Sequence, residues 1–239
     1  MDMRQTLGSF TTATGTLLFP LSLNEPDTKF DDSEDKIKYK ATIRLDGEAA
    51  AELLKLTEDT FAKWLDQVKV GSGKKPKTQA KNIQWFTKDT KRWDEIGASA
   101  TQMLDEIQEG EVIFKLTHKA FRKMRNGTYV PQRPAMFDSE GNGISEDKLP
   151  LIGHGSRAQL SGQFYGWTSQ AGVASMSLML RSVMLIDVVE PGQHREMSAE
   201  SFGFTPTEGF VVEPDANLET LKDSGVAADK DTTKKSHDF

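Results

Sequence analysis

Residues 149–190 decide the fold of this chain, and they read LPLIGHGSRAQLSGQFYGWTSQAGVASMSLMLRSVMLIDVVE. Side chains of two kinds alternate over 157–167, and a second, more apolar run follows over 176–189. A short polar segment that contains Gly172 separates the two. Alternation with a period of two is typical of a half-buried β-strand. The stretch therefore predicts two strands joined by a loop.

In the first of these strands, only one of the two sides is needed to form the core. Ala158, Leu160, Gly162 and Phe164 share the side expected to face the core. The other side carries a polar and aromatic set, namely Arg157, Gln159, Ser161, Gln163, Tyr165 and Trp167. Flat rings on a polar, basic face are stacking platforms for unpaired bases, each contributing roughly 1–3 kcal/mol. Alternatively, Tyr165 and Trp167 form the rim of a core or of a protein interface.

The N-terminal half predicts two strands. Residues 8–23 read as a strand that bends at Gly15. Residues 36–45 alternate cleanly, with Tyr39, Ala41, Ile43 and Leu45 on one side and Lys38, Lys40, Thr42 and Arg44 on the other. The second strand is therefore expected to be half-buried, with a basic outer face.

Helical spacing of apolar residues predicts a helix over 48–69, and Asp46 is placed to cap its first turn. Further elements are a short strand at 83–86, a second helix at 94–108 and a strand at 111–121. From residue 193 the sequence is polar and nearly aperiodic, which predicts a flexible tail. The expected organisation is thus a domain over 1–192 and a tail over 193–239.

Composition and charge narrow the class of protein. Of the 239 residues, 36% are hydrophobic and 28% are charged, which predicts a soluble chain with a modest core. The net charge of −6 does not by itself indicate nucleic-acid binding, but its distribution is uneven. Residues 201–239 hold eight acidic residues and four lysines, whereas 111–135 hold six basic residues against Glu111 alone. We therefore expect a basic region in the domain and a mildly acidic tail.

Two segments of the sequence look like phosphate-binding or metal-binding motifs, but neither is complete. GSGKKPKT, 71–78, lacks the first glycine and the final hydroxyl residue of a phosphate-binding loop. DSEGNG, 138–143, lacks the acidic twelfth residue of a calcium loop. There is no cysteine, and the four histidines have no ligand spacing. No signal peptide or apolar run of about 18 residues indicates secretion or a membrane. The sequence predicts a cytosolic protein that is not an enzyme and needs no cofactor or metal.

The stretch at 149–190 resembles the single-stranded DNA-binding proteins of short-tailed phage replication systems. It is similar to that family's block of P-I-I-G-x-G-S, then Y-x-W, then G-A-S and L-x-L-x-S-V-M-L. The closing Asp238-Phe239 is a weaker match. The resemblance implies an all-β OB-fold, a five-stranded antiparallel barrel with one or two helices, followed by a disordered acidic tail that ends in Phe. It also implies the cytoplasm of an infected bacterium, possible homodimers and tail contacts with polymerase and helicase.

The resemblance also assigns roles to residues. Tyr165 and Trp167 fall on the family's base-stacking aromatics, and Lys36, Lys38 and Lys40 lie around its phosphate-contacting strand. Asp238 and Phe239 fall on the partner-binding end of the tail. Together with the basic residues, the predicted DNA-binding set is Tyr165, Trp167, Lys36, Lys38, Lys40, Arg44, Lys115, Lys119, Arg122 and Arg157. Two departures stand out: Lys234-Lys235 lies close to the end of the tail, and the helix at 48–69 comes early in the strand order.

The function expected on this basis is coating of single-stranded DNA in phage replication, recombination and repair. Two alternatives remain open. A protein–protein adaptor would use the same aromatic and basic face as an interface hot spot. A nuclease is disfavoured, because the sequence has no evident cluster of metal-binding carboxylates.

Overall fold

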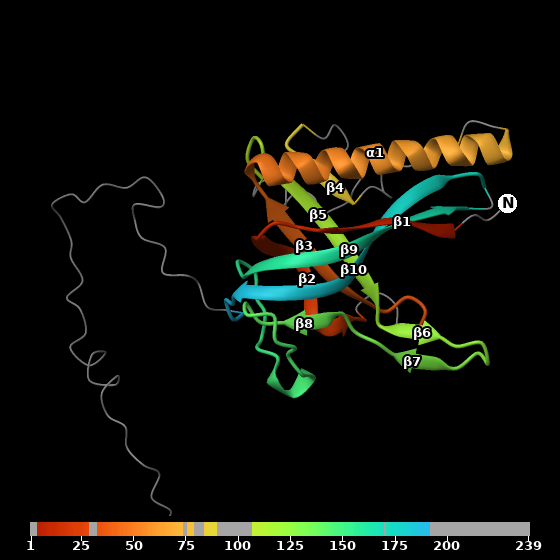
Figure 1. Cartoon of the computed structure of the whole chain (residues 1–239). Coiled ribbons are helices and arrows are strands. Elements are labelled where there is room, and N and C mark those ends of the chain that lie inside the picture. The colour runs from red at the N-terminus through yellow and green to blue at the C-terminus, as the bar shows by residue number, and fades with distance from the viewer. Residues whose placement is uncertain are drawn as a thin grey trace, which may run out of the picture. The chain divides into compact units, whose positions relative to one another are not determined.

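A computed structural model of the chain describes residues 4–28, 33–73, 76–78, 84–89, 107–169 and 171–191 (Figure 1). The described residues are rich in strands and contain a single α-helix. This agrees with the all-β class predicted from the sequence. The predicted helix at 94–108 falls almost wholly outside the described residues, as does the predicted tail at 193–239, so both stay predictions.

Five strands form a closed ring. They are β2 (Gly15–Asp27), β3 (Lys38–Leu45), β5 (Val112–Lys119), β10 (Ala174–Asp187) and β9 (Arg157–Thr168), and β9 pairs with both β10 and β2. Such a ring is the basis of an OB-like barrel. However, β10 runs parallel to β5, so the ring is mixed rather than wholly antiparallel as predicted. The reason is parity: directions cannot alternate all the way around a closed ring with an odd number of strands.

Further strands extend this ring. β1 (Arg4–Thr11) pairs with β9, β4 (Trp85–Thr87) with β5, and β8 (Ala135–Phe137) with β10. β6 (Phe121–Lys123) and β7 (Tyr129–Pro131) form a separate hairpin, and a short 3-10 turn spans Glu146–Lys148. The prediction for 83–86 therefore falls on β4, displaced by two residues at its start.

The predicted strand at 8–23 is two strands. β1 ends at Thr11 and β2 begins at Gly15, which is where the sequence predicted a bend. A Cβ atom on Gly15 would lie 2.4 Å from the backbone oxygen of Arg44. Only glycine allows the chain to pass this close to β3. Because the chain is interrupted between Thr11 and Gly15, β1 and β2 occupy different positions in the sheet, although both pair with β9.

The helix α1 (Gly47–Ser72) packs its apolar side onto the sheet (Figure 1). Leu53, Trp64 and Val68 are buried, and Trp64 is fully enclosed. Asp46 occupies the N-cap position as predicted, but its side chain makes no capping hydrogen bond. Gly73 ends the helix in the left-handed conformation, with φ of 66°. The helix therefore covers part of the core that the strands leave open.

Candidate nucleic-acid interface

The alternation predicted for β9 is present in the structure. Ala158, Leu160 and Phe164 are buried in the core, whereas Tyr165 and Trp167 are half-buried on the opposite side. Residues two apart on a strand lie about 7 Å apart on the same face. The two rings are thus neighbours on the outer side of the barrel wall, and each is neither fully buried nor fully exposed.

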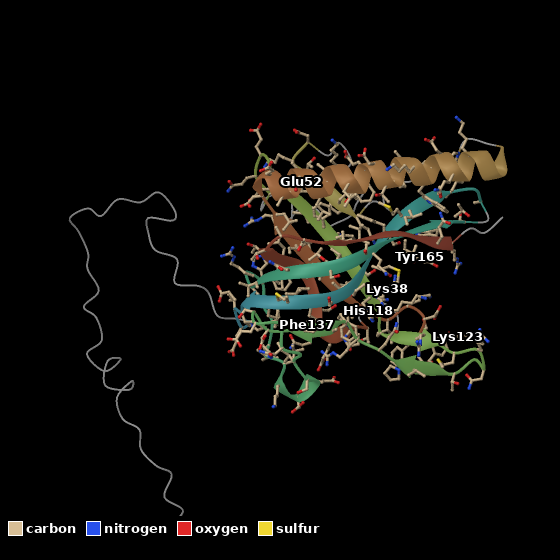
Figure 2. The ribbon with its side chains drawn as sticks, in the orientation of Figure 1. Lys38, Glu52, His118, Lys123, Phe137 and Tyr165 are labelled. Atoms are coloured by element: carbon tan, nitrogen blue, oxygen red, sulfur yellow. The ribbon has the colours of Figure 1, made fainter. Side chains whose placement is uncertain are left out.

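These two rings line a cavity of about 390 Å³, here called the aromatic cavity. The register of the strands brings its lining residues together. Arg4 of β1 pairs with Trp167, Met179 of β10 pairs with Thr117, and Lys38 of β3 pairs with Lys119. Figure 2 shows Tyr165 and Lys38 on the same side of the molecule. The lining residues come from five strands, and they are Arg4, Lys38, Thr117, Lys119, Tyr165, Trp167, Ser177 and Met179.

The cavity is cationic. Three of its lining side chains, Arg4, Lys38 and Lys119, carry positive charge, and none of the lining residues is acidic. Burial, together with the nearby charges of Lys119 and Lys40, holds the pKa of Lys38 below its usual range. Arg4 and Lys119 are exposed and Lys38 is partly buried, and the two neighbouring cations give a partly buried lysine no stabilisation. Such a wall is suited to an anionic ligand that relieves the repulsion.

The indole of Trp167 is held in place. Its Nε1–H donates a hydrogen bond to the hydroxyl oxygen of Ser177 at 3.1 Å, across the β9–β10 pair. On the core side of the same strand, Gly166 lies against Trp64 of α1. The position of the ring is therefore set from two directions before any ligand arrives.

Three other predicted lysines lie outside this cavity. Lys40 forms an ion pair with Asp27, so its charge is partly neutralised within the protein. Lys115 lies over the ring of Phe86, with 5.5 Å between its Nζ and the ring centroid. Burial and the charge of Lys40 lower the pKa of Lys115. Lys36 is exposed in the turn before β3.

Arg44 and Arg157 belong to a second cavity, of about 290 Å³. Both lie opposite Thr16 of β2, one on each neighbouring strand. Arg44 is paired with Glu111, with 3.5 Å between Nε and Oε1, and Asp46 also lines this cavity. The structure thus separates these two arginines from the aromatic pair. Arg122 lies on the β6–β7 hairpin, and Asp238 and Phe239 fall outside the described residues.

Sequence reasoning missed Arg4. This residue is close to the start of the chain, and no periodicity or motif marks it. It enters the cavity only because β1 pairs with β9 and places Arg4 opposite Trp167. Ser177 was missed for the same reason, since its role depends on the β9–β10 register.

Comparison with known proteins gives matches of structure only. No family model matches the chain, and no curated protein matches it. The crystal structure of gp2.5, a single-stranded DNA-binding protein encoded by bacteriophage T7, is similar with a TM-score of 0.54 and 16% identity, covering 88% of this chain and 100% of that chain. The single-stranded DNA-binding protein from bacteriophage Enc34, in complex with ssDNA, is similar with a TM-score of 0.51 and 12% identity, covering 78% of this chain and 90% of that chain.

The chain has the fold of these phage proteins. The same Enc34 protein without ssDNA also matches, at a TM-score of 0.51 and 12% identity over 82% of this chain and 90% of that one. The resemblance to phage single-stranded DNA-binding proteins, inferred from residues 149–190, is confirmed at the level of the fold. Among the described residues, no helix has the length and apolar composition that a membrane crossing requires.

Proposed function

We propose that this chain binds single-stranded DNA. The observation that carries the proposal is the cavity in which Tyr165 and Trp167 share a wall with Arg4, Lys38 and Lys119. Rings stack on bases of any sequence, and cations neutralise the phosphates between them. The shared fold supports this assignment, because the T7 and Enc34 proteins are described as single-stranded DNA-binding proteins.

The mechanism is binding without bond making or breaking. A base enters the cavity and stacks against Tyr165 or Trp167, while Lys38 and Lys119 contact phosphates on the side formed by β3 and β5. Because Trp167 is already fixed by Ser177, little side-chain entropy is lost when a base stacks on it. We place Lys36, Lys40, Lys115 and Arg122 outside the cavity, as contacts for DNA that continues beyond it.

The wider role follows from the resemblance. A protein that coats single-stranded DNA serves phage replication, recombination and repair in the cytoplasm of the infected host. We propose that Asp238 and Phe239 at the end of the tail recruit a partner such as polymerase or helicase, and that the protein forms homodimers. Sedimentation of the full chain tests the dimer, and a tail peptide that fails to bind either partner would contradict recruitment.

Titration of fluorescent oligo-dT, with duplex DNA and RNA as competitors, tests the proposed function. Tight binding of oligo-dT that duplex DNA does not displace is expected. Affinity should fall with salt at a log–log slope of about −0.7 for each phosphate contacted. No binding to oligo-dT at low salt would reject the proposal and favour the protein–protein adaptor. Magnesium-dependent cleavage of the oligonucleotide would favour the nuclease.

A further inference from the structure

The hairpin β6–β7 stands apart from the main sheet. Among the strands that the structure describes, its two strands pair only with each other, and its turn is closed by a hydrogen bond from the backbone amide of Met124 to the carbonyl of Thr128 at 2.8 Å. β6 begins two residues after Lys119, which lines the aromatic cavity. Figure 1 shows the hairpin projecting from the ring beyond the end of β5.

The base of this hairpin is firmly attached to the strands that build the cavity. Phe121 packs against a small buried cluster of Ile37, Tyr39 and Ala120, and Ile37 and Tyr39 flank Lys38 in sequence. Gln132 donates two hydrogen bonds. One runs from its backbone N–H to the carbonyl of Ala120 at 2.8 Å, and the other from its side-chain Nε2 to the carbonyl of Lys119 at 3.0 Å. The hairpin therefore has a defined position relative to Lys38 and Lys119.

The outer part of the hairpin has the chemistry of a nucleic-acid contact. Arg122, Lys123 and Arg125 are exposed, and the sequence has no acidic residue between Glu111 and Asp138. Tyr129 lies opposite Lys123 in the strand pair, with 5.4 Å between the lysine Nζ and the ring centroid. A ring next to a cation, on an arm without negative charge, combines the two features that single-stranded DNA-binding surfaces use.

We propose that the β6–β7 hairpin is a second contact site for single-stranded DNA, at which Tyr129 stacks on a base and Lys123 and Arg125 contact neighbouring phosphates. Lys123 lies four positions after Lys119, with a bend at Ala120 between them, so at most about 13 Å of chain separates the two lysines. A strand that leaves the cavity past Lys119 therefore meets the hairpin next. This inference rests on the proposed function and adds to it the direction in which bound DNA continues. Figure 2 shows Lys123 on the hairpin, on the same side of the view as Tyr165 and Lys38.

The experiment compares two lengths of oligo-dT, about 4 and about 16 nucleotides, which are the limits for one site of this type. The full chain and its Tyr129→Ala variant are titrated with each. We expect the variant to bind the long oligonucleotide about five-fold more weakly or worse, as the loss of one stacking ring implies, and to bind the short one as the unchanged protein does. Equal affinity of variant and unchanged protein for the long oligonucleotide would overturn the proposal.

Matched variants separate the ring from the fold of the hairpin. Tyr129→Phe keeps the ring and should bind within two-fold of the unchanged protein. Met124→Ala removes an exposed apolar side chain from the same hairpin and should have no effect. Lys123→Gln and Arg125→Gln should each reduce the log–log salt slope for the long oligonucleotide by about 0.7; unchanged slopes would contradict the phosphate contacts.

The outcomes also distinguish this inference from the proposed function. If the unchanged protein binds neither oligonucleotide, the proposed function fails and the hairpin site fails with it. If it binds both and Tyr129→Ala weakens both equally, the hairpin supports the cavity and is not a separate contact, so only this inference fails. Thermal unfolding of each variant shows that the comparison is made on folded protein.

Discussion

Gly166 of β9 lies directly beneath the indole of Trp64 from α1, so closely that a Cβ atom on Gly166 would be 2.7 Å from the Cδ2 atom of Trp64. Gly166 is also the residue between Tyr165 and Trp167, whose rings line the opposite side of the strand. The packing of the helix and the position of the two candidate stacking rings therefore depend on the same short piece of backbone.

Gly166→Ala should destabilise the protein by about 1–3 kcal/mol, because the added methyl group overpacks the contact with Trp64. Denaturant unfolding followed by circular dichroism measures this change. Gly143→Ala is the control, since a Cβ atom there has no atom within 4 Å. Combining Gly166→Ala with Trp64→Phe should cost less than the sum of the two single changes, because the two residues are in contact. Simple additivity would contradict the packing described here.

Tyr165→Ala and Trp167→Ala should each weaken binding of oligo-dT by roughly 1–3 kcal/mol, because each removes one stacking ring. Fluorescence anisotropy at fixed salt measures the affinity. Phe19→Ala is a matched control, since Phe19 is also a ring, 50% exposed, but does not line the aromatic cavity. Normal binding by a folded double variant of Tyr165 and Trp167 would reject the assigned platform.

Lys38→Gln should raise the stability of the free protein and lower its affinity for DNA. Burial and neighbouring lysines lower the pKa of this side chain, so its protonated form costs stability in the folded state. Because the folded pKa lies below the unfolded one, the unfolded state holds more protons between the two values, and stability rises with pH there. The advantage of Lys38→Gln should therefore shrink as pH rises toward 10.5. Thermal unfolding across this pH range provides the check.

The same pKa direction predicts how DNA binding depends on pH. Lys38 loses its positive charge at a lower pH than an ordinary lysine does as the solution becomes more alkaline. Affinity for oligo-dT should fall correspondingly early, and Lys38→Arg should delay the fall because a guanidinium stays charged. Titrations at several alkaline pH values measure both proteins; identical profiles would show that Lys38 does not contact phosphate.

The two cavities predict different effects of removing a cation. Lys119→Gln should reduce the log–log salt slope for an oligonucleotide of about 4 nucleotides by about 0.7, because Lys119 lines the aromatic cavity. Arg157→Gln should leave the slope for the same short oligonucleotide unchanged, since Arg157 lines the separate cavity beside Arg44. An equal effect of both changes would mean that the short strand does not bind where Tyr165 and Trp167 lie.

Local patterns in the sequence determined the strand-rich class, the two faces of β9 and the side of the sheet on which Tyr165 and Trp167 lie. These depend on the period of two along a single strand, which is a property of neighbouring residues. The apolar spacing of α1 and the bend at Gly15 could be read in the same way, since each depends on residues close together in the chain.

Only the tertiary structure decided which charges meet those rings. The sequence presents Lys38, Lys40, Arg44, Lys115 and Arg157 as equivalent, but strand register places Lys38 beside the rings, pairs Lys40 with Asp27 and sends Arg44 and Arg157 to another cavity. Arg4 joins the site through a pairing across more than 160 residues of sequence. Contacts of this kind depend on how the ring closes, and ring closure is set by long-range hydrogen bonds that no local pattern encodes.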